Sequence, residues 1–210
     1  MAGTYSSVAE VRALLHQRFP AEYARKMLHS VPVWPSIKER AEVLLPAVTG
    51  KAILDIGCTG KLSERLKAAA STYHGLDKYH GHAITLDLDT QPDELPVVPV
   101  DVVVCSEVLE HLANPGRFLA ALAKAYPTHD TYFSVPHAGA FTMHHGCEMV
   151  NLDHVAWYSY TTLTTLLSRY TYTVRAAWWY NGLPHRAEGL LVHARVEWPN
   201  DSSKDSPITT

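Results

Sequence analysis

The stretch Ile53-Leu54-Asp55-Ile56-Gly57-Cys58-Thr59-Gly60 decides the fold of this 210-residue chain. Its apolar first half is typical of a strand, and its two glycines predict a tight turn into a helix that begins near Leu62. Glycine lets the backbone of such a turn approach a ligand closely. The stretch therefore predicts an α/β sheet with a ligand site at the carboxyl end of this strand.

Short apolar runs alternate with helical segments after this turn, which is the pattern of a doubly wound α/β sheet. We expect strands at residues 52–56, 72–76, 83–86, 100–105 and 131–135. Helices are expected at 62–70, at 116–125 and, capped by Ser159, at 160–170. The runs 171–180 and 189–198 flank an Asn-Gly turn dipeptide and predict a terminal antiparallel pair. Together these elements predict a mostly parallel, seven-stranded, Rossmann-like sheet.

The two ends of the chain differ from this central pattern. Residues 1–48 predict a helical N-terminal extension or cap, and its last helix is expected to begin near Ser36. The polar residues 199–210 predict a disordered tail, because they carry too little apolar surface to offset the entropy of ordering. We therefore expect one ligand-binding domain at 49–198.

The charge and the cysteine content exclude several classes of protein. Eighteen basic and 21 acidic residues give a net charge of −3 without a basic run, so a nucleic-acid partner is not expected. The apolar stretches are too short to span a bilayer, which predicts a cytoplasmic protein with no membrane partner. The three widely spaced cysteines are expected to be reduced thiols.

Carboxylates follow three consecutive predicted strands. Asp55 precedes the glycine turn and would repel a pyrophosphate, so a cationic or amine-bearing ligand suits it better. Asp77 ends the next strand, where a carboxylate can accept both hydroxyls of a ribose. Asp87 could meet the exocyclic amine of a base while Leu88 covers its face. Each of the last two could instead be an ordinary carboxylate of a solvated loop.

The segment Asp101–Leu112 with Asn114-Pro115 is the most specific of these patterns. Taken together, DIGCTG at 55–60, GLD at 75–77 and SEVLEHL at 106–112 resemble class I S-adenosylmethionine-dependent methyltransferases of the small-molecule type. The resemblance runs from about residue 51 to 167, and DHVAWYS at 153–159 reinforces it. It implies an enzyme that uses S-adenosylmethionine to methylate O or N of a small metabolite or a glycan.

The resemblance also implies which residues hold the cofactor. The methionine part would contact Asp55, Gly57, Cys58 and Gly60, the ribose Asp77 with Lys78 beside it, the adenine Asp87 and Leu88, and the sulfonium Cys105 and Ser106. The family usually carries a further glycine in D-x-G-x-G-x-G. This chain keeps two glycines there, which places the strength of cofactor binding in doubt.

Histidines are the candidate general bases for a hydroxyl or protonated amine acceptor, because their pKa lies near neutral pH. His137, His145 and His154 fall between the fifth strand and the next helix, and His111 follows the fourth strand. His111 could instead bond a nearby backbone group at a helix start, and His154 could pack beside aromatic neighbours. The cluster at 144–148 holds His, Cys and Glu but lacks the i, i+4 spacing of a helical metal site, so no metal is expected.

Two other functions remain open at this stage. The glycine-poor turn also fits a methyltransferase-like protein that acts as a non-catalytic binding partner. A nicotinamide-dependent oxidoreductase is disfavoured because G-x-G-x-x-G is missing.

Aromatic residues of the C-terminal half, among them Trp178 and Trp179, could wall an acceptor pocket, fill the core or form a homodimer surface.

Overall fold

The computed structural model describes residues 34–79, 81, 84–138, 153–182 and 187–198. Eight strands form one sheet in the order β1-β7-β8-β6-β5-β2-β3-β4. Their bounds are β1 Ser36–Ile37, β2 Ala52–Ile56, β3 Thr72–Asp77, β4 Ile84–Thr85, β5 Val102–Ser106, β6 Asp130–Pro136, β7 Tyr172–Tyr180 and β8 Gly189–Val196. The α-helices with printed bounds are α3 Ala41–Val48, α4 Gly60–Ala69, α5 Pro115–Ala125 and α7 Tyr160–Arg169.

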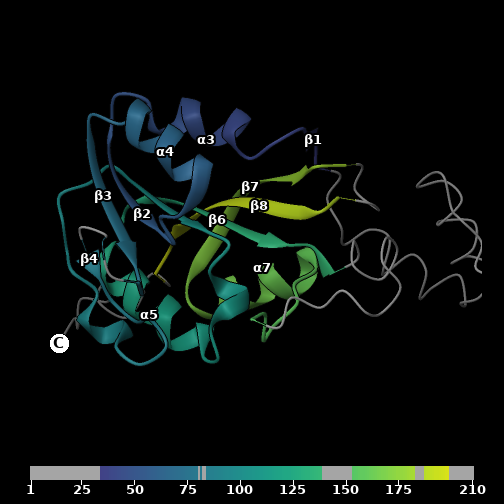
Figure 1. The fold of residues 1–210 in the computed structure, drawn as a ribbon. Coiled ribbons are helices and arrows are strands. Elements are labelled where there is room, and N and C mark those ends of the chain that lie inside the picture. Colours follow the sequence, from purple (N-terminus) through teal and green to yellow (C-terminus); the bar gives the residue numbers. More distant parts are fainter. Residues whose placement is uncertain (1–33, 80, 82–83, 139–152, 183–186, 199–210) are drawn as a thin grey trace, which may run out of the picture.

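The predicted Rossmann-like sheet is confirmed. The strands from β4 through β6 pair in parallel, whereas β8 runs antiparallel to both β6 and β7. Helices α3 and α4 cover one face of the sheet, and α5 and α7 cover the other (Figure 1). Ser159 caps α7 as predicted, because its side chain accepts a hydrogen bond from the backbone of Thr162.

Successive side chains of the central strands point to opposite faces of the sheet, and those on each face pack in an apolar layer. Ile53 and Val102 point toward α3 and α4, where they pack with Leu44. Leu54 and Val103 point to the opposite face and join the larger core beneath α5 and α7. Both layers are fully buried, so the sheet holds its strand ends in fixed positions for a ligand site.

The strand count is one higher than predicted, because the segment at Ser36 is a short edge strand. A helix start near Ser36 was wrong, since α3 begins at Ala41 and residues 36–37 pair in parallel with β7. The amides of Trp179 and Asn181 donate hydrogen bonds to the carbonyls of Pro35 and Lys38. These bonds pair backbone amides at the edge of β7 and keep residues 36–37 extended.

The first 33 residues of the predicted helical extension and the predicted tail at 199–210 lie outside the described residues. No helix in the described ranges is both long and apolar enough to cross a membrane.

Asp130 at the start of β6 predicts a pH dependence of stability. Its carboxylate accepts hydrogen bonds from Arg195 and from His193 Nε2 at 2.6 Å, and these partners, Arg195 first, hold its pKa well below the usual range. A depressed folded-state pKa stabilises the protein above the unfolded pKa of about 4, and this stabilisation is lost as the pH falls through the folded value. We expect Asp130→Asn to cost about 2 kcal/mol of unfolding free energy at pH 7. Urea denaturation should show the gap between the two proteins narrowing below about pH 4; a pH-independent gap would contradict this account.

Candidate active site

A cavity of about 420 Å³ opens at the carboxyl ends of β2, β3 and β5. This edge is where parallel α/β sheets bind ligands, because the turns after neighbouring strands diverge there. The wall is formed by the turn after β2, the end of β3, the loop after β4 and the turn after β5. The cavity therefore collects residues that are far apart in the sequence.

The turn after β2 depends on glycine at position 57. Gly57 has φ of +77°, and its amide donates a hydrogen bond to the carbonyl of Leu76 at 2.9 Å. A Cβ atom at this position would lie 2.5 Å from Cγ2 of Val108 and 3.1 Å from the carbonyl oxygen of Ser106. The turn thus presses against the backbone that follows β5, which brings two walls of the cavity together.

Gly57→Ala and Gly60→Ala should separate backbone strain from steric clash at this turn. Both glycines have φ near +77°, but a Cβ at Gly60 would have no atom within 4 Å. We expect Gly60→Ala to lose about 1 kcal/mol and Gly57→Ala roughly 2–4 kcal/mol, because only the latter adds overpacking against Val108. Equal losses in chemical denaturation would mean that the contact with Val108 relaxes at little cost.

One half of the cavity carries the predicted ribose and adenine residues. Asp77 is 9% exposed, and its Oδ1 accepts a hydrogen bond from the amide of Tyr79 at 3.0 Å. Asp87 holds its own loop by accepting from the amide of Asp89 at 3.0 Å, and Leu88 beside it is buried. A buried carboxylate and a loop with both apolar and acidic side chains thus line one space, a combination that suits a nucleoside.

The predicted cofactor residues divide into two groups. The cavity wall contains Gly57, Asp77, Lys78, Asp87, Leu88 and Ser106, whereas Asp55, Cys58, Gly60 and Cys105 are not part of it. Asp55 lies within β2, 1% exposed, and accepts a hydrogen bond from the hydroxyl of Tyr73 at 2.7 Å. Cys58 and Gly60 border a second hollow on the side of Tyr73. Cys105 points into the core because strand alternation turns it away from the cavity.

Burial keeps the Cys58 thiol protonated. Its pKa rises to about 11, chiefly through burial and then through the negative charge of Asp55. A neutral thiol is a small apolar side chain here, not a nucleophile.

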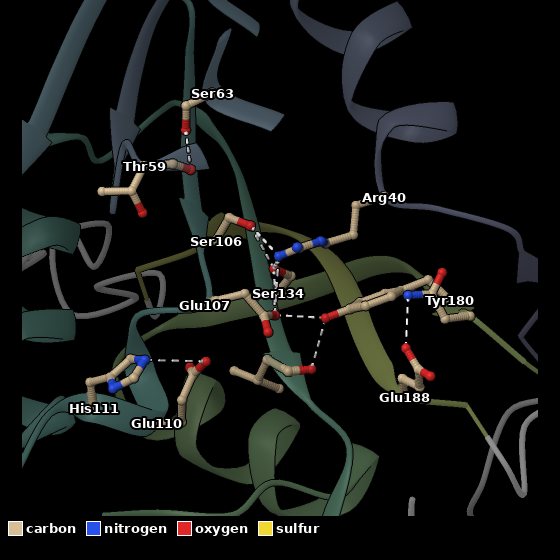
Figure 2. Close-up of polar contacts among 12 residues, drawn as sticks. Arg40, Thr59, Ser63, Ser106, Glu107, Glu110, His111, Ser134, Tyr180 and Glu188 are labelled. Carbon is tan, nitrogen blue, oxygen red and sulfur yellow. Dashed lines mark hydrogen bonds and ion pairs between the residues drawn. The ribbon is translucent and has the colours of Figure 1, made fainter. Parts of the chain in front are cut away.

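Ser106 belongs to a polar group whose other members, Arg40, Glu107, Ser134 and Tyr180, the sequence did not predict (Figure 2). Arg40 and Glu107 line the cavity together with Ser106. Arg40 Nη1 donates to Ser106 Oγ at 2.7 Å and to Ser134 Oγ at 3.1 Å, and it forms an ion pair with Glu107 Oε1 at 3.2 Å. The hydroxyl of Tyr180 donates to the same Glu107 oxygen at 2.6 Å. These residues come from four separate segments, so their assembly needs the complete sheet.

Glu107 occupies a strained position within this group. Its φ of +56° is unusual for a residue with a side chain, and its amide donates to the carbonyl of Ser134 at 2.9 Å. Burial, followed by the Glu107 charge, raises the pKa of Tyr180 well above its ordinary value, so this hydroxyl remains a donor. The turn after β5 thus holds one carboxylate between a guanidinium and a phenol.

The predicted histidine bases are placed differently from one another. His111 lies on the cavity wall, and its Nδ1 is 3.0 Å from the carbonyl oxygen of Asp153. His154 packs edge-on against His111 with ring centroids 4.7 Å apart, and it also contacts Trp157. His137 lies away from this wall against Trp179, and burial lowers its pKa. His145 and the rest of the 144–148 cluster lie outside the described residues.

Both alternative interpretations of the histidines correspond to contacts in the structure. His111 pairs with a backbone carbonyl, and His154 packs beside an aromatic ring. His111 still lines the cavity while it makes its backbone contact, so this contact is compatible with the predicted role of His111 as a base.

The comparisons with known proteins agree with this architecture. A family model described as a methyltransferase domain matches residues 23–177. The ubiquinone biosynthesis O-methyltransferase of Hahella chejuensis is 34% identical over 148 residues, which cover 61% of this chain and 60% of that protein. The enzyme of the same name from Pseudomonas entomophila is 29% identical over 138 residues, 56% of each chain. The chain thus spans about three fifths of the length of these relatives.

Solved structures show the same fold at low sequence identity. An S-adenosylmethionine-dependent methyltransferase from Mesorhizobium loti matches with a TM-score of 0.54 at 20% identity, covering 73% of this chain and 94% of its own. The N-methyltransferase NodS from Bradyrhizobium japonicum, in complex with S-adenosyl-L-homocysteine, matches with a TM-score of 0.53 at 18% identity, covering 73% and 82%. Because the family model spans most of the chain and the sheet has the expected topology, this chain belongs to the methyltransferase domain family.

Proposed function

We propose that the chain is an S-adenosylmethionine-dependent methyltransferase that methylates an oxygen or nitrogen of a small molecule or a glycan. The observation that carries this proposal is the buried carboxylate of Asp77 at the end of β3, which lines the same cavity as the glycine turn after β2. Family membership supports the cofactor, and the names of the sequence relatives favour oxygen as the acceptor atom.

The described residues fit an adenosyl ligand in three parts. Asp77 would accept hydrogen bonds from both ribose hydroxyls, and Asp87 with Leu88 would hold the adenine. The backbone at Gly57 lines the cavity, so it would lie beside the methionine part. When bound, S-adenosylmethionine supplies a methyl group on a positively charged sulfur.

The acceptor would lie between this ligand and the group formed by Arg40 and Glu107. The wall there also contains Ser106 and His111, so polar groups of both signs can orient a hydroxyl. Holding the acceptor atom about 3–3.5 Å from the methyl carbon and excluding water are the main tasks of the protein in such a displacement. His111 is the predicted base best placed for this role.

Calorimetric and thermal-shift titrations with S-adenosylmethionine, S-adenosylhomocysteine and NAD test the proposal. Both adenosyl ligands should bind and raise the melting temperature, whereas NAD should not. Transfer of a labelled methyl group to a panel of phenols, sugars and amines would then identify the acceptor class. Failure of both adenosyl ligands to bind would overturn the proposal and favour a non-catalytic partner protein.

A further inference from the structure

Two parts of the cavity wall that are far apart in the sequence share one apolar layer. The 86–91 loop follows β4, and the 107–113 turn follows β5 and carries His111. Both segments contribute side chains to the cavity wall. Leu88 of the loop and Leu112 of the turn are buried in the same layer of the core. A polar contact between the two segments can therefore fix how they are arranged around a ligand.

Asp89 makes a hydrogen bond with each of these segments. Its Oδ1 accepts from the amide of Ala113 at 2.8 Å, although the two residues are 24 positions apart. Its own amide donates to Oδ1 of Asp87 at 3.0 Å, which closes a tight turn within the loop. A hydrogen bond to a carboxylate is roughly twice as strong as one between neutral groups. Asp89 therefore fastens the loop to the backbone just after His111 and also orients Asp87.

The bond from the Asp89 amide leaves a defined part of Asp87 for a ligand. This bond occupies Oδ1, and among the described residues no group donates to Oδ2. Asp87 lines the cavity, so Oδ2 is the oxygen available to the exocyclic amine of an adenine. A displacement of Asp89 would therefore change how this amine is bound.

His111 is positioned by contacts of both its ring and its backbone. Its Nδ1 lies 3.0 Å from the carbonyl oxygen of Asp153, and its amide donates to the carbonyl of Val108 at 3.0 Å. The bond from Ala113 to Asp89 fixes the chain where it leaves this turn. The position of His111 thus depends on the loop after β4 as well as on its own segment.

We propose that Asp89 is a positioning residue that holds the 86–91 loop and the 107–113 turn in one fixed arrangement. This inference rests on the proposed function, because it assigns the loop to the adenine and His111 to the acceptor. Asp89 would act through Asp87 on the cofactor and through the Ala113 backbone on the acceptor side. A cofactor that orders the loop would then also order the turn that carries His111.

A second contact joins the same two regions outside the cavity and provides a matched control. Arg117 Nε donates to Oδ2 of Asp93 at 3.1 Å, and both side chains are exposed. Neither Arg117 nor Asp93 lines the cavity. Asp93→Ala therefore removes a carboxylate that links the segment after β4 to α5 and leaves the cavity wall intact.

Calorimetry with S-adenosylhomocysteine and S-inosylhomocysteine tests the adenine side. The second ligand carries a carbonyl oxygen where adenine carries its exocyclic amine. We expect Asp89→Ala to weaken S-adenosylhomocysteine binding by about 10-fold and binding of the inosyl ligand by less than about 3-fold, because only the former offers an amine to Asp87. Asp89→Asn keeps an oxygen that can accept from the Ala113 amide, so it should stay within about 3-fold of the wild type. Asp93→Ala should bind both ligands with unchanged affinity.

Hydrogen exchange tests the acceptor side without turnover. In the wild type, S-adenosylhomocysteine should slow exchange in the 86–91 loop and also in the peptide that contains Ala113. In Asp89→Ala, this peptide should exchange about 10-fold faster, and the ligand should protect the loop alone. Asp89→Asn should restore the wild-type response, and urea denaturation would verify that each variant is folded.

Either of two results would overturn the proposal. One is an Ala113 peptide that responds to the ligand in Asp89→Ala as it does in the wild type. The other is an equal loss of affinity for both ligands in Asp89→Ala and in Asp93→Ala, which would make Asp89 a general structural support. A wild type that binds no S-adenosylhomocysteine would instead contradict the proposed function, and exchange at Ala113 in the ligand-free proteins tests the Asp89 contact even then.

Discussion

Asp77→Ala should weaken S-adenosylhomocysteine binding by roughly 100-fold, the largest effect that we expect on the proposed cofactor site. The carboxylate is 9% exposed and faces the cavity, so a ribose bound there would lose two charge-assisted hydrogen bonds. Such bonds contribute about 1.5–3 kcal/mol each, and about 3 kcal/mol in total corresponds to that loss of affinity. Isothermal titration calorimetry at constant ionic strength would measure it.

Two further variants serve as controls for the Asp77→Ala measurement. Asp77→Asn keeps the shape and the oxygen that accepts from the Tyr79 amide, so we expect an intermediate affinity with an intact loop. Asp93→Ala removes an exposed carboxylate that pairs with Arg117, and it should leave the affinity unchanged. Wild-type affinity in Asp77→Ala would show that the ribose is held elsewhere.

Gly189→Ala should be the most destabilising single substitution that we predict. A Cβ atom on Gly189 would lie 1.9 Å from Cζ of Tyr180, its partner across the β7–β8 pair. Tyr180 is buried and its hydroxyl is bound to Glu107, so the ring cannot move aside without breaking that contact. Overpacking with a lost hydrogen bond should cost roughly 3 kcal/mol or more of unfolding free energy.

Gly116→Ala provides the matched comparison. Its Cβ would lie 2.0 Å from the hydroxyl oxygen of Tyr170, the far end of a half-buried side chain. This side chain can swing away, and alanine favours a helix by up to about 1 kcal/mol over glycine. We expect a change below about 1 kcal/mol in chemical denaturation. Equal losses for the two variants would mean that Tyr180 moves as easily as Tyr170.

Local sequence patterns predicted the strands and helices whose ends are marked by residues within or next to them. The strand at Ala52–Ile56 has the predicted bounds because an apolar run ended by glycine determines both its ends. The helix at Tyr160–Arg169 begins where its capping serine placed it. The Ser36 segment was predicted wrongly, since its conformation depends on hydrogen bonds to β7, more than 140 residues later.

The same distinction applies to the candidate site. Asp77 could be predicted from its position at a strand end, whereas Arg40 and Ser134 carry no pattern that places them beside Glu107. The burial of Glu110 could not be read from a polar segment of a loop.

Arg40 has a consequence for engineering this chain. Its guanidinium bonds Ser106 and Ser134 and pairs with Glu107, although it precedes the glycine turn and lies within residues 1–48. Exchanging those residues as a module, a common way to change the substrate range of an enzyme, would therefore also remove a cation from the candidate site. A chimaera that joins a new N-terminal segment to this sheet must keep arginine at that position, or replace Glu107 together with it.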